Sequence, residues 1–167
     1  DYRQSIARLL TLVDHERNAA TGPRQKAIYD LTRTEVLLER LGNPHKQIPA
    51  VHIAGTKGKG STAALCDAAI RAAGLSTGFY SSPHIHTFRE RIRRDSEPIS
   101  QEIFAGLVEG LWPLHRELQK DAEFGPLTLF EYLTGMAFQC FAQDRVDAQV
   151  IEVGLGGRLD ATNVLDA

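Results

Sequence analysis

The sequence predicts an α/β fold in which a mainly parallel sheet is flanked by helices. Three short apolar runs, 49–54, 76–81 and 148–153, are each followed by a glycine-rich or polar segment, which is typical of buried parallel strands. Longer stretches with apolar residues at helical spacing separate the runs. A crossover from the first strand to the second should be right-handed and leave the two strands parallel.

Two helices are expected before the first strand. The first is amphipathic and ends near Glu16, a break follows at Thr21-Gly-Pro23, and Gly42-Asn-Pro44 stops the second. Their apolar stripes are Ile6, Leu9, Leu10 and Val13, then Ile28, Leu31, Leu38 and Leu41. We interpret residues 1–45 as a helical segment that packs on the sheet.

Three further helices are predicted at 62–73, 100–119 and 128–143. The first is rich in alanine and ends at Gly74, a good residue for a helix C-terminus. Its small side chains, which should let it lie close on the sheet, are Ala63, Ala64, Ala68, Ala69 and Ala72. Cys66 and Cys140 lie in helical apolar patterns far apart in the sequence, so we expect buried free thiols.

A glycine-rich turn joins the first strand to the alanine-rich helix. Its sequence, Gly55-Thr-Lys-Gly-Lys-Gly-Ser-Thr62, departs from the usual G-x-x-x-x-G-K-[ST] loop because Gly60 is inserted before Ser61. It still has glycines that admit a phosphate, Lys59 at the mouth and a hydroxyl that opens the helix. A helix N-terminus also favours an anion. The alternative is a strand-to-helix connection that binds nothing.

A carboxylate stands inside the last apolar strand. Glu152 is costly to bury there unless it is paired or binds a cation. The strand beside a phosphate-loop strand commonly supplies an acidic residue to Mg²⁺. Next to the turn that carries Lys59 and Ser61, we expect a metal ligand rather than half of a buried ion pair. The glycines after Glu152 permit close backbone approach.

A long polar connection, residues 82–95, follows the second strand. It lies at the carboxyl end of a parallel strand, where open α/β sheets bind ligands. Its basic side chains are Arg89, Arg91, Arg93 and Arg94. Because Glu90 and Asp95 are interleaved with them and Phe88 is the one candidate for base stacking, we expect a solvated or substrate-facing loop rather than a nucleic-acid surface.

Composition narrows the function classes. The formal net charge is -2 with both signs interspersed, and 43% of the 167 residues are hydrophobic. These values argue against a nucleic-acid surface and a polybasic membrane anchor, and no apolar run approaches the length of a membrane span. The six histidines form no H-x-x-x-H pair that would indicate zinc. We expect a cytoplasmic protein without nucleic-acid or membrane partners.

Four stretches together resemble the folylpolyglutamate synthase and dihydrofolate synthase family of the Mur ligase superfamily. They are Gly55-Thr-Lys-Gly-Lys-Gly-Ser61, Ser82-Pro-His84 with Phe88-Arg-Glu-Arg-Ile92, Thr128-Leu-Phe-Glu-Tyr-Leu-Thr134, and Glu152-Val-Gly-Leu-Gly-Gly-Arg-Leu-Asp-Ala-Thr-Asn163. The last is close to a family signature. Gly60 separates this family from the wall-building Mur ligases, which usually have threonine there. The resemblance implies a P-loop NTPase-like domain, of which residues 46–167 would be the N-terminal part.

The resemblance implies an ATP-dependent carboxylate-amine ligase that adds L-glutamate to folate or dihydropteroate through an acyl phosphate. The implied cofactors are ATP and Mg²⁺, and the full-length protein would be a monomer. The implied phosphate-binding residues are Thr56, Lys57, Gly58, Lys59, Gly60, Ser61 and Thr62. Lys59 and Ser82 would be catalytic, and Ser61, Ser82 and Glu152 would hold Mg²⁺. The implied substrate-binding residues are Ser82, His84, Arg91, Thr128, Phe130, Asp160 and Ala161, with His84 and Arg91 in a mobile loop.

Enzymes of this family continue well beyond 167 residues. The resemblance therefore implies an N-terminal fragment that is inactive alone and lacks the rest of the ATP-binding domain and the C-terminal domain. Two alternatives stay open. One is a nucleotide-binding module without catalysis. The other is a P-loop small-molecule kinase or another Mur-type ligase; a kinase leaves the stretch 152–163 unexplained.

Overall fold

The structure of the chain, a computed structural model, describes residues 1–14, 30–121 and 124–165. Its strands are β1 (Ala50–Ile53), β2 (Thr77–Tyr80), β3 (Ile92–Arg94), β4 (Glu97–Pro98) and β5 (Ala148–Glu152). Its α-helices are α1 (Tyr2–Leu9), α3 (Thr32–Arg40), α4 (Lys59–Ala72), α5 (Gln101–Lys120) and α6 (Leu129–Asp144). Two short 3₁₀ helices are η1 (Pro44–Lys46) and η2 (Phe88–Arg91).

The three predicted strands form the parallel part of one sheet, with β1 at its edge. The strand order is β1-β5-β2-β3-β4, and β5 is parallel to both β1 and β2. The register places Ile53 opposite Glu152 and Tyr80 opposite Ile151. The carboxyl ends of these strands therefore meet at one edge, and the prediction of an α/β fold with flanking helices is confirmed.

A β-hairpin occupies part of the segment that we predicted to be a polar loop. In this hairpin β3 pairs antiparallel with both β2 and β4. Asp95 and Ser96 make its two-residue turn with φ of 49° and 76°, the left-handed conformation that a tight hairpin requires. The Arg93 guanidinium lies 5.4 Å from the centre of the Phe79 ring, so this charged strand covers apolar surface.

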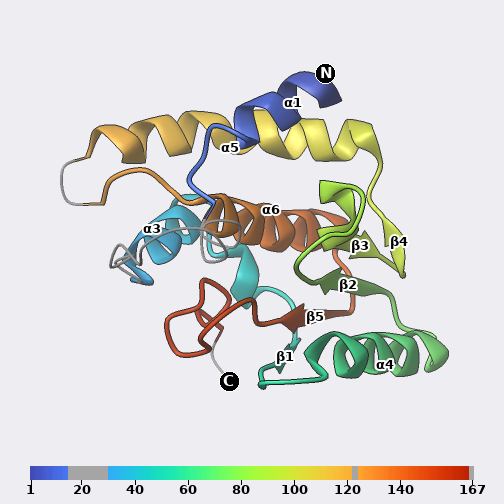
Figure 1. The fold of residues 1–167 in the computed structure, drawn as a ribbon. Helices are drawn as coiled ribbons and strands as arrows, with labels where there is room; N and C mark the ends of the chain where they lie inside the picture. The colour runs from blue at the N-terminus through green and yellow to red at the C-terminus, as the bar shows by residue number, and fades with distance from the viewer. Residues whose placement is uncertain (15–29, 122–123, 166–167) are drawn as a thin grey trace.

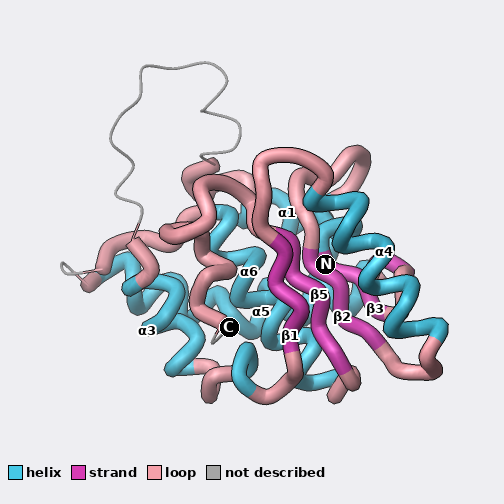
Figure 2. Tube along the Cα trace, turned by 90° about the horizontal axis from the view of Figure 1, so that it is seen from below, coloured by secondary structure: helices cyan, strands magenta, loops and turns pink. Residues whose placement is uncertain are grey.

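The helices form unequal layers on the two faces of the sheet (Figure 1). α4 covers one face and packs Ala63 against Ile53, Phe79 and Val150. α6 lies against the other face, with α3 and α5 packed on it and α1 outermost on α5. The view from below shows α4 on the near side of the sheet, α5 and α6 behind the strands, and α3 to one side of them (Figure 2).

The predicted packing of α4 is wrong for most of its alanines. Ala63 is buried, whereas Ala64, Ala68, Ala69 and Ala72 are exposed. The contact stripe of α4 instead includes Asp67, whose carboxylate accepts a hydrogen bond from the Thr77 hydroxyl at 2.6 Å. A polar side chain thus fills a place where the alanine pattern predicted close apolar contact.

The first predicted helix is shorter than expected. α1 ends at Leu9, and Leu10 and Val13 are exposed rather than on a buried stripe. The predicted helix end at Glu16, the break at 21–23 and the stripe residue Ile28 lie outside the described residues. α1 contacts α5, and α3 contacts α5 and α6, so this segment packs on the helical layer.

The two cysteines are free, and Cys140 is buried while Cys66 is half-buried. Burial raises the pKa of the Cys140 thiol to about 12, so this thiol is unreactive near neutral pH. Among the described residues, no helix is both long enough and apolar enough to cross a membrane.

A buried histidine should make stability depend on pH. His115 is 4% exposed between the Trp112 and Tyr132 rings, and burial lowers its pKa. Below pH ~6.5 the unfolded state therefore binds a proton that the folded state does not bind. As the pH is lowered through this range, the free energy of unfolding should fall by at most ~1.4 kcal/mol per pH unit. His115→Phe should flatten that part of the pH profile in denaturant unfolding. An unchanged slope below pH ~6.5 would contradict a neutral buried His115.

Candidate functional site

The glycine-rich turn places a helix N-terminus at the carboxyl edge of the sheet. α4 begins at Lys59, three residues earlier than predicted, because Gly58 adopts the left-handed conformation (φ 74°) and starts the helix. The first intrahelical hydrogen bond runs from Thr62 N–H to the Gly58 carbonyl at 2.9 Å. The N–H groups of Lys59, Gly60 and Ser61 precede it, which is the arrangement that binds anions.

Glu152 ends β5 and lies directly beside this turn. Its side chain is 6% exposed, and a Cβ built on Gly60 would lie 3.4 Å from Glu152 Oε1. Burial raises the pKa of Glu152, while the Ser82 N–H and the positive charge of Lys59 act against that shift. A glycine at position 60 therefore lets the helix N-terminus approach a buried carboxylate closely.

Ser82 follows β2 and joins the same site. Its backbone N–H donates to Glu152 Oε2 at 3.4 Å, and its side chain is half-buried. The structure thus brings together Lys59, Gly60, Ser82 and Glu152 from three separate segments. This meeting follows from the parallel strand order, since each residue lies at or just beyond a strand's carboxyl end.

The residues that meet at the start of α4 suit a Mg²⁺ ion that is also bound by a phosphate. One buried carboxylate, Glu152, lies beside the start of α4 and accepts from the Ser82 N–H, and Mg²⁺ characteristically uses one or two carboxylates together with substrate phosphates. The described residues contain no group of three or more His, Cys, Asp or Glu that could hold a metal ion by themselves. The residues therefore fit a metal that arrives with a nucleotide.

A second cluster forms where the segment after β5 meets the start of α6. A Cβ built on Gly154 would lie 2.6 Å from the Phe130 ring and 3.1 Å from Asp160 Oδ2, so the three residues are in close contact. Ala161 beside them is buried. Thr128 caps α6, accepting from the Glu131 N–H at 3.2 Å. The four residues predicted to bind substrate here thus come from two adjacent segments.

Asp160 organises the segment that contains it. Its Oδ2 accepts from the Leu155 N–H at 2.8 Å, and its Oδ1 accepts from the N–H and hydroxyl of Thr162 at 3.0 and 2.6 Å. The carboxylate is 4% exposed. Three of its roughly four acceptor positions are therefore used within the loop.

His84 and Arg91, the two predicted loop residues, contact each other. Arg91 is 2% exposed and its Nε donates to His84 Nδ1 at 3.0 Å. The neighbouring Glu90 carboxylate accepts from the N–H groups of Ile85, His86 and Thr87 at 2.7–3.0 Å. Arg91 is thus enclosed rather than solvated, and the segment is held by its own hydrogen bonds.

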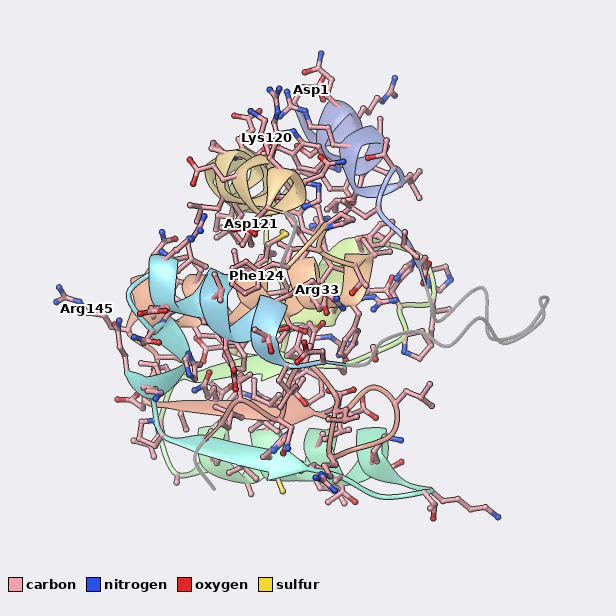
Figure 3. The ribbon with its side chains drawn as sticks, turned by 90° about the vertical axis from the view of Figure 1, so that its left-hand side faces the viewer. Asp1, Arg33, Lys120, Asp121, Phe124 and Arg145 are labelled. Atoms are coloured by element: carbon pink, nitrogen blue, oxygen red, sulfur yellow. The ribbon has the colours of Figure 1, made fainter. Side chains whose placement is uncertain are left out.

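Two long-range pairs were missed from the sequence. Arg33 on α3 binds Glu131, with Nη2 and Nε 2.8 and 3.1 Å from Oε1 (Figure 3 labels Arg33). His52 on β1 lies 2.9 Å from the Thr162 hydroxyl. The partners are 98 and 110 residues apart, so no local motif marks them.

Arg33→Met should destabilise the protein by about 3–5 kcal/mol, because it leaves the buried Glu131 carboxylate without its guanidinium. Arg40→Met on the same helix is the matched control. The Arg40–Glu117 pair is exposed, so its loss should change the free energy of unfolding by less than about 1 kcal/mol. Denaturant unfolding measures both; equal effects of the two variants would contradict a special role for the buried pair.

The curated proteins that the chain resembles carry the same kind of name. No family model matches the chain. It is 38% identical over 173 residues to mitochondrial folylpolyglutamate synthase of Cricetulus griseus, covering 99% of this chain and 29% of that protein. It is 45% identical over 137 residues to dihydrofolate synthase/folylpolyglutamate synthase of Bacillus subtilis, covering 81% of this chain and 32% of that protein. The chain thus spans about a third of these relatives.

Solved structures share the fold. Folylpolyglutamate synthase of Thermotoga maritima is similar at a TM-score of 0.85 and 42% identity, over 99% of this chain and 36% of that one. A complex of FPGS with AMPPCP and folate is similar at a TM-score of 0.85 and 38% identity, over 99% of this chain and 38% of that one. The similarity therefore covers nearly all of this chain.

Proposed function

We infer that this chain, which belongs to the folylpolyglutamate synthase and dihydrofolate synthase family, is the phosphate-binding part of an ATP-dependent ligase. The ligase would join L-glutamate to folate or dihydropteroate. The observation that carries the proposal is the meeting of the α4 N-terminus, Glu152 and Ser82 at one edge of the sheet. A relative that binds AMPPCP and folate supports it.

The α4 N-terminus would hold the phosphates of ATP. Residues 56–62 would supply backbone N–H groups, and Lys59 would neutralise charge on the phosphoryl group being transferred. Glu152, Ser61 and Ser82 would hold Mg²⁺. When bound, this ion supplies a positive charge that neutralises phosphate oxygens.

Amide formation requires activation of the carboxylate, because a carboxylate is a poor acyl donor. We propose that a substrate carboxylate oxygen attacks the γ-phosphorus of ATP, breaking its bond to the β–γ bridging oxygen and releasing ADP. The amine of glutamate then attacks the acyl carbon and expels phosphate. The chain's own contribution would be to position the reactants at Ser82 and to neutralise negative charge with Lys59.

The second cluster would bind the pteridine ring of the substrate. Phe130 offers an aromatic surface and Asp160 an acceptor beside it, with Thr128 and Ala161 adjacent. His84 and Arg91 would lie in the substrate loop after β2. Residues 46–167 would form part of the ATP-binding domain, with residues 1–45 packed outside it.

The small net charge of -2 supports small-molecule substrates rather than nucleic acid. We propose a cytoplasmic monomer without a membrane partner. Size-exclusion chromatography with light scattering on the full-length protein would test the monomer, since a dimer would double the measured mass.

The function is tested by assaying the full-length protein with dihydropteroate and, separately, with a reduced folate, each with glutamate and Mg-ATP. We expect phosphate release that requires both the pterin substrate and glutamate. Phosphate transfer to a hydroxyl acceptor without glutamate would instead support a kinase, and nucleotide binding without turnover would support a module that lacks catalysis.

A further inference from the structure

A three-residue chain of hydrogen bonds links β1 to the segment after β5. The Thr162 hydroxyl donates to Asp160 Oδ1 at 2.6 Å, and His52 Nε2 lies 2.9 Å from the same hydroxyl. A hydroxyl has one hydrogen, which Asp160 receives, so His52 must donate from Nε2–H. Burial lowers the pKa of His52, which keeps the imidazole neutral near pH 7 with its single N–H on Nε2.

The chain of hydrogen bonds lies on the α6 side of the sheet. Ile53 packs against α4, so the preceding residue, His52, points to the opposite face. Thr162 is fully buried and Asp160 is 4% exposed. The link therefore connects β1, the edge strand that leads into the glycine-rich turn (residues 55–62), with the segment after β5 that carries Asp160.

The link also fixes the direction of the Asp160 carboxylate. With Oδ1 held by Thr162, Oδ2 points to the Leu155 N–H and lies beside Gly154 and the Phe130 ring. One acceptor position of this carboxylate is left for a ligand. A rotation of the carboxylate would break the bond to Leu155 and move that position away from Phe130.

We propose that His52 and Thr162 are positioning residues that orient Asp160 for a flat, hydrogen-bond-donating heterocycle stacked on Phe130. This inference rests on the proposed function, in which that heterocycle is the pteridine ring. His52 and Thr162 act through Asp160 and lie outside the glycine-rich turn (residues 55–62) that we propose to hold the phosphates. Their loss should therefore weaken binding of the pterin substrate while leaving that of ATP unchanged.

The test compares Thr162→Val with Thr162→Ser in the full-length protein. Valine has the shape of threonine without the hydroxyl, so the KM for folate should rise about 10-fold or more. The KM for ATP should change by less than about 2-fold, because the glycine-rich turn (residues 55–62) keeps its contacts. Serine retains the hydroxyl and should restore the KM for folate to within about 3-fold of wild type.

His52 gives an independent pair of variants. His52→Gln keeps an N–H donor at similar reach and should resemble wild type, whereas His52→Leu should raise the KM for folate as Thr162→Val does. The double variant His52→Leu/Thr162→Val should be no worse than the more affected single variant, since both break one chain. This pair serves the same measurement if Thr162→Val does not fold.

The outcomes separate the inference from the proposed function. A wild-type protein that binds neither folate nor dihydropteroate overturns both. If the wild type binds folate and both Thr162→Val and His52→Leu keep its KM, the positioning role alone is wrong. Equal losses for folate and ATP, or failure of serine to restore folate binding, would also overturn it, because they indicate general damage to the fold.

Discussion

Replacement of Lys59 by alanine should lower the turnover of the full-length protein by roughly 10²-fold or more. Lys59 is the first residue of α4 and is half-buried where Glu152 and Ser82 meet. The positive charge of Lys59 favours the ionised carboxylate of Glu152 and acts to lower its pKa. Loss of a charge that stabilises a phosphoryl group in transfer should lower kcat more than it raises the KM for folate.

Lys120→Ala is the matched control for this variant. Lys120 is exposed at the end of α5, on the side of the molecule away from the sheet (Figure 3). Its removal should leave kcat within about 2-fold of wild type, as expected for a surface change away from the site. Unchanged turnover in Lys59→Ala would remove Lys59 from the mechanism, and the assay is ADP or phosphate release with saturating substrates.

The three parallel strands were predictable because each is a short apolar run between clear breaks. The predicted runs 49–54, 76–81 and 148–153 match β1, β2 and β5 to within one residue at each end. The hairpin of β3 and β4 was not predicted, because its sequence lacks the usual signals of a hairpin. Its strand residues include Arg93 and Arg94, and its turn is Asp-Ser rather than Asn-Gly, so neither apolar alternation nor a strong turn pair was present.

The place where the candidate site residues meet was predictable where it depends on local sequence. The glycine-rich turn (residues 55–62) and Glu152 each stand out in the sequence alone, and parallel pairing of β1 with β5 brings the ends of their strands together. The Arg33–Glu131 pair and the His52–Thr162 link could not be predicted, since each joins residues about 100 positions apart. The helix face of α4 was also mispredicted, because alanine suits an exposed helix surface as well as a buried one.

Glu152→Gln should abolish most activity without weakening the fold. The substitution preserves shape and removes the one carboxylate that we place on Mg²⁺, so turnover should fall by roughly 10²-fold and the Mg²⁺ concentration needed for half-maximal rate should rise. Burial disfavours the charge of Glu152. In the absence of ligands, the glutamine variant should therefore be at least as stable as the wild type near pH 7.

A loss of activity without a loss of stability would distinguish a functional role of Glu152 from a structural one. Glu97→Gln on β4 is the same substitution at an exposed position of the same sheet, and it should change neither quantity. A Glu152→Gln variant that loses activity because it unfolds would instead indicate a structural carboxylate. A variant that keeps its Mg²⁺ dependence would remove Glu152 from the metal site. Lost activity with an unchanged free energy of unfolding would instead support the proposal that Glu152 binds a cation, because removal of a buried charge alone should not destabilise the fold.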